Sequence, residues 1–428
     1  MQKNGLIAPA AIAATLLATG IQAIAAQEIS TKDVLTTYAD IALAKYEDSL
    51  ATAQDLQRSV TQLLDAPSAT TMQQARQTWI AARAPYQQSE VYRFGNAAVD
   101  DWEGRVNAWP LDEGLIDYVV APNYGTESDE NLFYTANVIA NTRLTVGGVE
   151  VDASKITPAL LSETLHEIDG IEANVASGYH AIEFLLWGQD LNGTKPGAGN
   201  RPATDFDLQN CSNGNCDRRR DYLQAATELL ITDLQEMVVN WKTSGIARED
   251  LMAKGEQSAI ATILTGMGSL AYGELAGERT KLGLMLHDPE EEHDCFSDNT
   301  HWSHYYDAKG IKNVYLGSYT RVNGEKVTGP SLSDYVASQS QDVDQKLREK
   351  LDLTEAAAQV MVERAAKGET FDVLIGEGNA AGNQVVQDFV DALSAETKAI
   401  ENVIAVLKLD NIELESSDSL DNPSLVLE

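Results

Sequence analysis

Residues 31–65 read TKDVLTTYAD IALAKYEDSL ATAQDLQRSV TQLLD, and this stretch decides the fold class. Apolar side chains recur in it at steps of three and four residues: Leu35, Tyr38, Ile41, Ala42, Tyr46 and Leu50. Side chains with this spacing share one face of an α-helix and can pack against a neighbour. The stretch therefore predicts one long amphipathic helix.

The same periodicity continues through most of the chain. It predicts further helices over about 70–94, 158–187, 218–243, 248–286, 331–347, 354–366 and 378–408. The segments 95–150, 188–217 and 287–330 carry little helical pattern, and short strands are expected near 142–151 and 319–327, where β-branched residues flank a Gly turn. This order of helical runs and long irregular excursions indicates an all-α protein of two pseudo-duplicated helical bundles.

The N-terminus has the three parts of a secretory signal peptide. Lys3 is the only charge before an apolar run from Leu6 to Ala26, and the run ends in the small-residue pattern Ala23-Ile-Ala25. An uncleaved membrane anchor is the alternative, because the run approaches the roughly 20 residues that span a bilayer. The expected domains are a signal peptide at 1–26, an N-terminal bundle at 27–200, a C-terminal bundle at 201–409 and a loose acidic tail at 410–428.

The charge balance limits the partners. The chain has 65 acidic and 31 basic residues and a formal net charge of −34. Such a field repels nucleic acid and anionic lipid and attracts cations, so we expect no nucleic-acid partner.

Two of the three cysteines, Cys211 and Cys216, lie close together in a turn-rich segment. In an oxidising compartment such a pair forms a disulfide bond, whereas a zinc site would need more ligands than this loop offers. Cys295 is then left as a free thiol.

A polar stripe runs along the predicted helix 70–94. Its members follow steps of four, three, four and three: Trp79, Arg83, Tyr86, Glu90 and Arg93. A solvated helix face is the alternative, but exposed faces seldom mix these charges with Trp and Tyr. The stripe predicts the lining of a cavity.

A second stripe lies in Gly178-Tyr-His-Ala-Ile-Glu-Phe-Leu-Leu-Trp-Gly188, where His180, Glu183 and Trp187 stand at i, i+3 and i+7. The imidazole and the carboxylate are therefore neighbours on a helix that is otherwise apolar. A buried carboxylate needs a partner, which is either a hydrogen bond from His180 or a metal ion that both residues bind.

Two irregular segments, 105–118 and 292–302, can supply further ligands from acidic, aromatic and His residues. The run Ser297-Asp-Asn-Thr300 could instead only cap a helix. Polar loops that converge on a buried His–Glu face are typical of a ligand site. The expected binding residues are His180, Glu183, Glu90, Arg93, Asp112, Asp298 and His301, with Glu113 as a further carboxylate; the expected lining is Arg83, Tyr86, Trp109, Trp187, Ser297 and Asn299.

Four segments together resemble the imelysin family. Gly178–Glu183 is similar to its GxHxxE signature, and residues 86–95, 109–113 and 295–301 are similar to the subgroup called iron-regulated protein A. The resemblance spans roughly residues 30–408. It implies two helical-bundle halves around the GxHxxE helix, and a protein of the periplasm or outer membrane linked to iron uptake.

Three functions follow from the residues and this resemblance. The first is binding of iron, or of an iron-bearing small ligand such as a chelate or haem, together with other envelope iron-uptake proteins. The second is a zinc-type metallopeptidase of the kind implied by the family's alternative name, M75 peptidases, although the chain lacks His-Glu-x-x-His. The third is an interaction scaffold in which His180 and Glu183 form only a core hydrogen bond. The expected cofactor is a metal ion, with iron placed first and zinc as the alternative.

Overall fold

The structure, a computed structural model, describes residues 1–2, 29–410 and 412–426. The predicted signal peptide lies almost entirely outside the described residues. No helix in the described part of the chain is both long and apolar enough to cross a membrane.

The all-α prediction is confirmed. The helices of the main body are α1 (Thr31–Asp65), α2 (Ala69–Gln87), α3 (Ala97–Asn107), α7 (Gly178–Trp187), α8 (Cys216–Trp241), α9 (Ile246–Ala253), α10 (Glu256–Ser269), α11 (Leu282–Leu286), α12 (Thr300–Leu316), α13 (Leu332–Gln339), α14 (Gln341–Ala365), α15 (Phe371–Ile375) and α16 (Ala380–Leu407). Shorter helices are α4 (Glu113–Ile116), α5 (Ala121–Tyr124), α6 (Pro158–Leu160), α17 (Asp418–Asp421) and α18 (Pro423–Val426).

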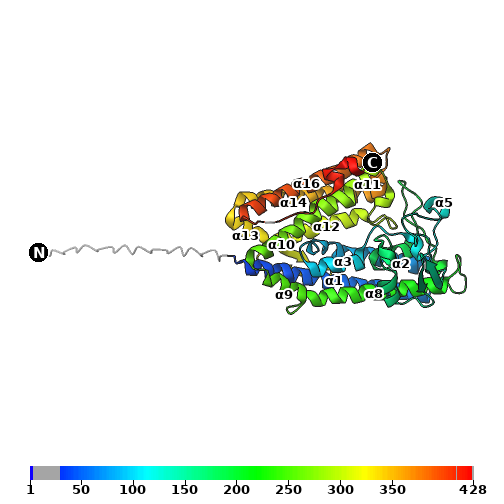
Figure 1. Cartoon of the computed structure of the whole chain (residues 1–428). Coiled ribbons are helices and arrows are strands. Elements are labelled where there is room, and N and C mark those ends of the chain that lie inside the picture. Colours follow the sequence, from blue (N-terminus) through cyan, green and yellow to red (C-terminus); the bar gives the residue numbers. More distant parts are fainter. Residues whose placement is uncertain (3–28, 411, 427–428) are drawn as a thin grey trace.

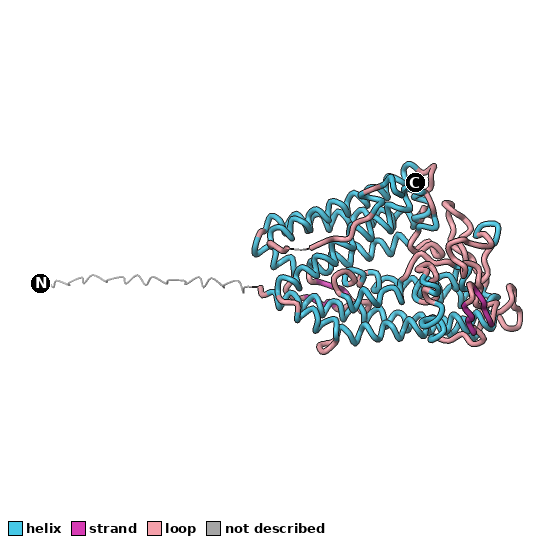
Figure 2. Tube along the Cα trace, viewed as in Figure 1, coloured by secondary structure: helices cyan, strands magenta, loops and turns pink. Residues whose placement is uncertain are grey.

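The helices form two groups that share one apolar core. Helix α1 packs against α2 and α8, while α14 packs against α16 and α12, and α12 also contacts α2. Figure 1 shows α14 and α16 along one edge of the molecule, α1 and α8 along the other, and α10 and α12 between them. Most long loops gather at one end (Figure 2). The boundary near residue 200 stays a prediction.

The strands in the described part of the chain form two antiparallel hairpins. Both hairpins lie where short strands were expected. Strand β1 (Arg143–Val146) pairs with β2 (Val149–Asp152), and β3 (Ser318–Thr320) pairs with β4 (Lys326–Thr328). The disulfide bond Cys211–Cys216 closes the loop before α8, with the two Cα atoms 5.9 Å apart, and Cys295 is free.

The prediction of one helix over 70–94 is wrong, because α2 ends at Gln87. Pro85 lies in its last turn, where the ring lacks an N–H for the helical hydrogen bond and crowds the preceding turn. Glu90 lies instead in the 3-10 turn Glu90–Tyr92, and Arg93 follows that turn. The five residues of the predicted stripe therefore do not share one helix face.

The segment 158–187 is also not one helix. Glu167, Asp169 and Gly170 have φ values of 52°, 66° and 73°, and this left-handed backbone separates the first turns, α6 and the π-helix Leu161–Leu165, from α7. At the start of α7, a Cβ on Gly178 would lie 2.5 Å from the carbonyl oxygen of Val106. Glycine therefore allows α7 to begin directly against α3.

Residues 287–330, expected to be irregular, contain the helix α12. Its buried side chains include His301, His304 and Asp307, so its inner face is polar and lacks the apolar periodicity used for prediction. Elsewhere the boundaries differ by less: 248–286 breaks at Gly255 and continues through the π-helix Leu270–Lys281, and 354–366 belongs to the long helix α14.

The C-terminal segment, expected to be loose, packs on the π-helical region of the chain. A Cβ placed on Gly268, Gly273 or Gly277 would lie only 2.6, 2.7 and 2.2 Å from Leu414, Glu415 and Ser417, respectively. The three glycines form a groove that the segment fills, and the Ser269 hydroxyl accepts a hydrogen bond from the Glu415 amide at 3.0 Å.

Candidate metal centre

His180 and Glu183 lie on α7, whose ten residues are all buried. Nδ1 of His180 lies 3.0 Å from Oε2 of Glu183. The other oxygen, Oε1, accepts hydrogen bonds from the Ser297 amide at 3.0 Å and the Ser297 hydroxyl at 2.6 Å. Both oxygens of Glu183 are therefore engaged, and the pair faces the loop that precedes α12.

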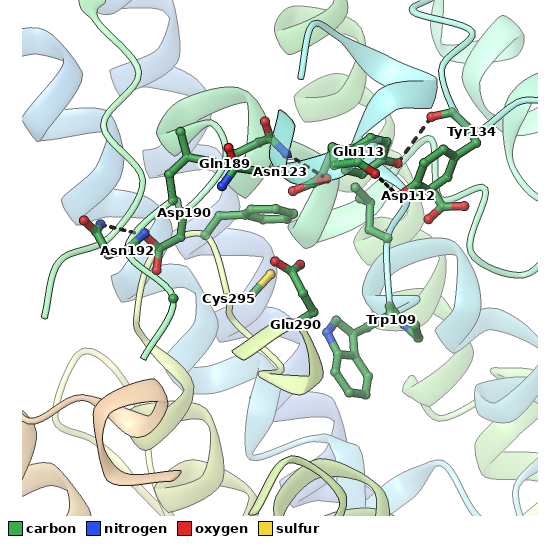
Figure 3. A pocket seen from close by; sticks show the side chains of 16 residues that line it. Trp109, Asp112, Glu113, Asn123, Tyr134, Gln189, Asp190, Asn192, Glu290 and Cys295 are labelled. Atoms are coloured by element: carbon green, nitrogen blue, oxygen red, sulfur yellow. Dashed lines mark hydrogen bonds between the residues drawn. The ribbon is translucent and has the colours of Figure 1, made fainter. Parts of the chain in front are cut away.

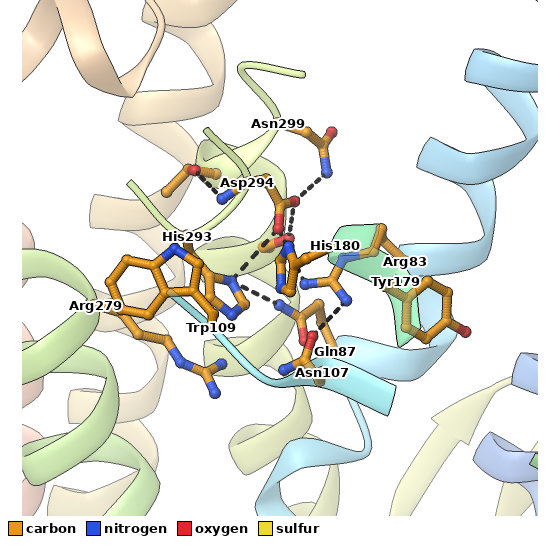
Figure 4. A network of polar contacts seen from close by, with 12 residues as sticks. Arg83, Gln87, Asn107, Trp109, Tyr179, His180, Arg279, His293, Asp294 and Asn299 are labelled. Carbon is orange, nitrogen blue, oxygen red and sulfur yellow. Dashed lines mark hydrogen bonds and ion pairs between the residues drawn. The ribbon is translucent and has the colours of Figure 1, made fainter. Parts of the chain in front are cut away.

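This loop brings His293 and Asp294 to His180. One ligand atom from each of the three residues lies within 4.8 Å of the other two, and the two imidazole centroids are 4.9 Å apart. His180 and His293 are 1% exposed and Asp294 is 0% exposed. Figure 4 shows the three side chains converging, with Trp109 beside His293. The group offers two nitrogen donors and one carboxylate.

Asp294 is held from several sides. Its Oδ1 accepts from Arg83 at 3.0 Å, and its Oδ2 accepts from Asn299 at 2.8 Å and Ser303 at 2.5 Å. Burial favours the neutral carboxyl, but Arg83 and these donors outweigh it and hold the pKa of Asp294 below its usual value. The carboxylate is therefore ionised and oriented.

Both imidazoles are neutral at neutral pH, which is the state that binds metals. Burial, with the charge of Arg83, lowers the pKa of His180 to about 3. Burial and the charge of Arg279 lower the pKa of His293 well below its usual value. Burial and the neighbouring Asp294 raise the pKa of Glu183 well above its usual value.

One nitrogen of the site has no hydrogen-bond partner. Nδ1 of His180 faces Glu183, whereas its Nε2 is buried without a hydrogen-bond partner among the described residues. An unpaired buried nitrogen costs free energy unless something binds it. This nitrogen is therefore available to a ligand.

Several predicted residues lie around this centre. Ser297 and Asn299 hold Glu183 and Asp294, and Arg83 joins Asp294 to the Asn107 side chain, whose Oδ1 lies 2.6 Å from Nη1. The Trp109 ring lies edge-on to His293 at 5.6 Å, and its indole N–H donates to the Glu292 carbonyl. Tyr86 packs on Tyr179, and Trp187 packs on Trp79, so these two line the core near α7.

Other predicted residues lie elsewhere, which differs from the expectation of one shared cavity. Glu90 pairs with Arg279 at 2.8 Å, and Arg93 pairs with Asp100, Glu103 and Glu274. The reason is the end of α2 at Gln87, which turns both residues away from the Arg83 face. The Asn107 side chain links this neighbouring network to Arg83, since it accepts from Arg83 and donates to Glu90 and Glu103.

The remaining acids and His301 are also outside the ligand group. Asp112 accepts from Asn131 at 2.5 Å and, with Glu113, lines a pocket of about 470 Å³ (Figure 3). Asp298 lies with Asp190 and Asp372. His301, in the first turn of α12, is buried with its Nδ1 unpaired among the described residues.

Sequence reasoning did not single out His293, Asp294 or Arg279. The first two stand in the segment 292–302 that was singled out, but their direction depends on a loop with no periodicity. A cavity of about 390 Å³ reaches His293, and its charged lining consists of Glu103, Glu274, Glu278 and Glu291 with Arg93 and Arg279.

Comparisons with known proteins give a family and a fold. A family model described as Imelysin, peptidase M75, matches residues 42–400. A stretch of 91 residues is 30% identical to "Iron-regulated protein A" of Synechococcus elongatus; the match covers 21% of this chain and only 26% of that relative. What that whole relative does is therefore not shown for this chain.

Two solved structures share the fold over nearly the whole chain. The first is described as an iron-regulated protein A precursor from Parabacteroides distasonis, with a TM-score of 0.62, 17% identity, and coverage of 90% of this chain and 97% of the other. The second is an imelysin-like protein from Psychrobacter arcticum, with a TM-score of 0.55, 17% identity, and coverage of 89% and 97%.

Proposed function

This chain belongs to the imelysin family, and on that premise we propose that it is an exported protein of iron acquisition that binds iron between its helical groups. The ligands of this proposal are His180, His293 and Asp294. Glu183, first considered as a ligand, orients His180 from behind, because Ser297 and His180 already engage its two oxygens.

The observation that carries the proposal is the convergence of three donor atoms, all within 4.8 Å of one another, in a fully buried centre. Two imidazoles and one carboxylate form a donor set that Fe(II) uses in proteins, and Zn²⁺ accepts the same set. The unpaired Nε2 of His180 fits a metal ion, because an ion would satisfy this buried nitrogen.

Iron is placed first because of the relatives. Both a curated relative and a solved structure carry the name iron-regulated protein A, and this association is taken over here as part of the proposal. Export is supported by the disulfide bond Cys211–Cys216, since such bonds persist in oxidising compartments.

The geometry does not favour the metallopeptidase alternative. A peptide bond and an attacking water would have to reach the ion together. The three proposed ligands are at most 1% exposed, which leaves a peptide no approach to them. In this proposal a bare ion approaches through the cavity of about 390 Å³ beside His293, whereas a chelate or haem would require the centre to open.

The first test is a calorimetric titration with Fe(II) without oxygen, on full mature protein stripped with chelator. We expect one tight site in the wild type. His293→Ala should lower the Fe(II) affinity by more than about 10–100-fold, which is the loss seen when only a hydrogen-bonded neighbour of a ligand is removed. His166→Ala, a change of the same type outside the centre, should bind like the wild type. Equal affinity of the wild type and His293→Ala would refute the proposal.

A further inference from the structure

A second group of carboxylates lies outside the His180 centre. Asp190 follows α7 in the loop after Trp187, Asp298 belongs to the turn before α12, and Asp372 is the second residue of α15. One oxygen from each lies within 4.8 Å of the other two.

These carboxylates have no basic partner among the described residues, since no Lys, Arg or His ion pair involves them. Asp372 is 0% exposed, and neither of its oxygens has a hydrogen-bond partner in that part of the chain. Asp298 is 7% exposed, and its Oδ1 is also without a partner there. Buried acceptors of this kind are costly unless a cation or a proton satisfies them.

The pKa values of these carboxyl groups reflect the same burial. Burial, with Asp372 and Asp190 nearby, raises the pKa of Asp298 to about 8. Burial raises the pKa of Asp372 to about 6.

We propose that Asp190, Asp298 and Asp372 form a second cation site, which takes a hard, oxygen-preferring divalent ion of the Ca²⁺ class. All three donors are carboxylate oxygens, without the nitrogen that distinguishes the His180 centre. Calcium binds oxygens at about 2.3–2.6 Å, so oxygens on opposite sides of one ion can be nearly 5 Å apart. The observed separations fit this geometry.

The site has a route to solvent. Asp190 is half-buried and lines the pocket of about 470 Å³ together with Asp112, Glu113 and Glu290 (Figure 3). These acids attract cations toward Asp190. The two deeper carboxylates, Asp298 and Asp372, then complete the coordination with water or backbone oxygens.

An ion here would join three segments that are far apart in the sequence. The loop after α7 already lies against the end of α15, since a Cβ on Gly376 would be 3.2 Å from Thr194. The amide of Gly199 in the same loop donates to the carbonyl of Phe296 at 2.9 Å. We therefore expect Ca²⁺ to stabilise the folded protein against unfolding.

The test is a Ca²⁺ titration of chelator-stripped full mature protein, followed by calorimetry and by thermal unfolding. In the wild type, millimolar Ca²⁺ should raise Tm, and Mg²⁺ should raise it less. Asp372→Asn should lose at least about tenfold in Ca²⁺ affinity, because a direct ligand matters no less than a ligand's neighbour. Asp101→Asn removes an exposed charge and should behave like the wild type.

Two further variants separate this site from the iron site and from a folding defect. His293→Ala should keep the full Ca²⁺ response. Asp298→Asn should lower the Ca²⁺ affinity as Asp372→Asn does. It should not strain the backbone, because Asn tolerates the left-handed φ of 55° at this position. An absent Ca²⁺ response in the wild type, an equal response in Asp372→Asn, or an equal response to Mg²⁺ would overturn the proposal.

Discussion

At the scale of single residues, Glu183 shows how the centre is prepared before an ion arrives. It faces His180 Nδ1 with one oxygen and accepts two hydrogen bonds from Ser297 with the other. A carboxylate behind an imidazole selects the ring nitrogen that faces the metal and raises its basicity. Glu183 is therefore a positioning residue in the proposed site.

Glu183→Gln should lower Fe(II) affinity by about 10–100-fold, because the amide holds the ring but cannot share its proton as a carboxylate does. The same change should also alter proton release. Burial raises the pKa of Glu183, so the His180–Glu183 pair holds a proton more tightly without the ion, and binding should release more protons from the wild type than from the Gln variant.

Calorimetry in two buffers of different ionisation enthalpy measures this release. A purely structural role for Glu183 would lower Tm and leave the proton count unchanged, which would contradict the prediction.

The sequence predicts part of the site for a clear physical reason. His180 and Glu183 are three residues apart on one helix, so their contact is local and visible in the spacing. Ser297 and Asn299 could be expected only as members of a polar loop. The pairing of His180 with His293 depends on tertiary structure, and no local pattern encodes it.

At the scale of elements, helix periodicity fails where a helix carries a polar inner face. Helix α12 was missed because His301, His304 and Asp307 occupy positions that apolar residues fill in an ordinary helix. In α2 the periodicity continues beyond Gln87, but the helix ends there, two residues after Pro85. Helix α16 shows the opposite case: its pattern is clear, yet it buries Glu396, whose two oxygens lack a partner among the described residues.

Glu396 should make stability depend on pH. Burial raises its pKa from 4.5 to about 7, so the folded protein holds this proton more tightly than the unfolded chain. The resulting stability is complete below about pH 4.5 and disappears as pH rises through about 7. The difference is on the order of 3 kcal/mol.

Glu396→Gln should therefore raise Tm relative to the wild type at pH 8 and raise it much less at pH 5. Thermal unfolding in the presence of chelator measures both values. Glu401→Gln, on an exposed position of the same helix, is the matched control and should change neither. Parallel pH profiles of Glu396→Gln and the wild type would contradict this account.

At the scale of the whole molecule, both proposed ion sites lie where the two helical groups meet. His180 comes from α7, which packs on α2 and α8, and His293 and Asp294 come from the loop before α12, which packs on α14. In the second site, Asp190 follows α7, whereas Asp298 precedes α12 and Asp372 lies in α15, which packs on α16. The net charge of −34 and the acidic pocket beside Asp190 favour the approach of cations to this junction. Periodicity in the sequence could predict the helices. It could not predict where the two helical groups meet, because that depends on how the helices pack.

Anomalous scattering at the iron absorption edge tests the central claim most directly. Crystals of the full mature protein, loaded with Fe(II) without oxygen, should show one strong iron peak bounded by His180 Nε2, His293 and Asp294. Crystals of His293→Ala treated in the same way should lack it. Iron peaks found only elsewhere, or no peak between these three side chains in the wild type, would contradict the account.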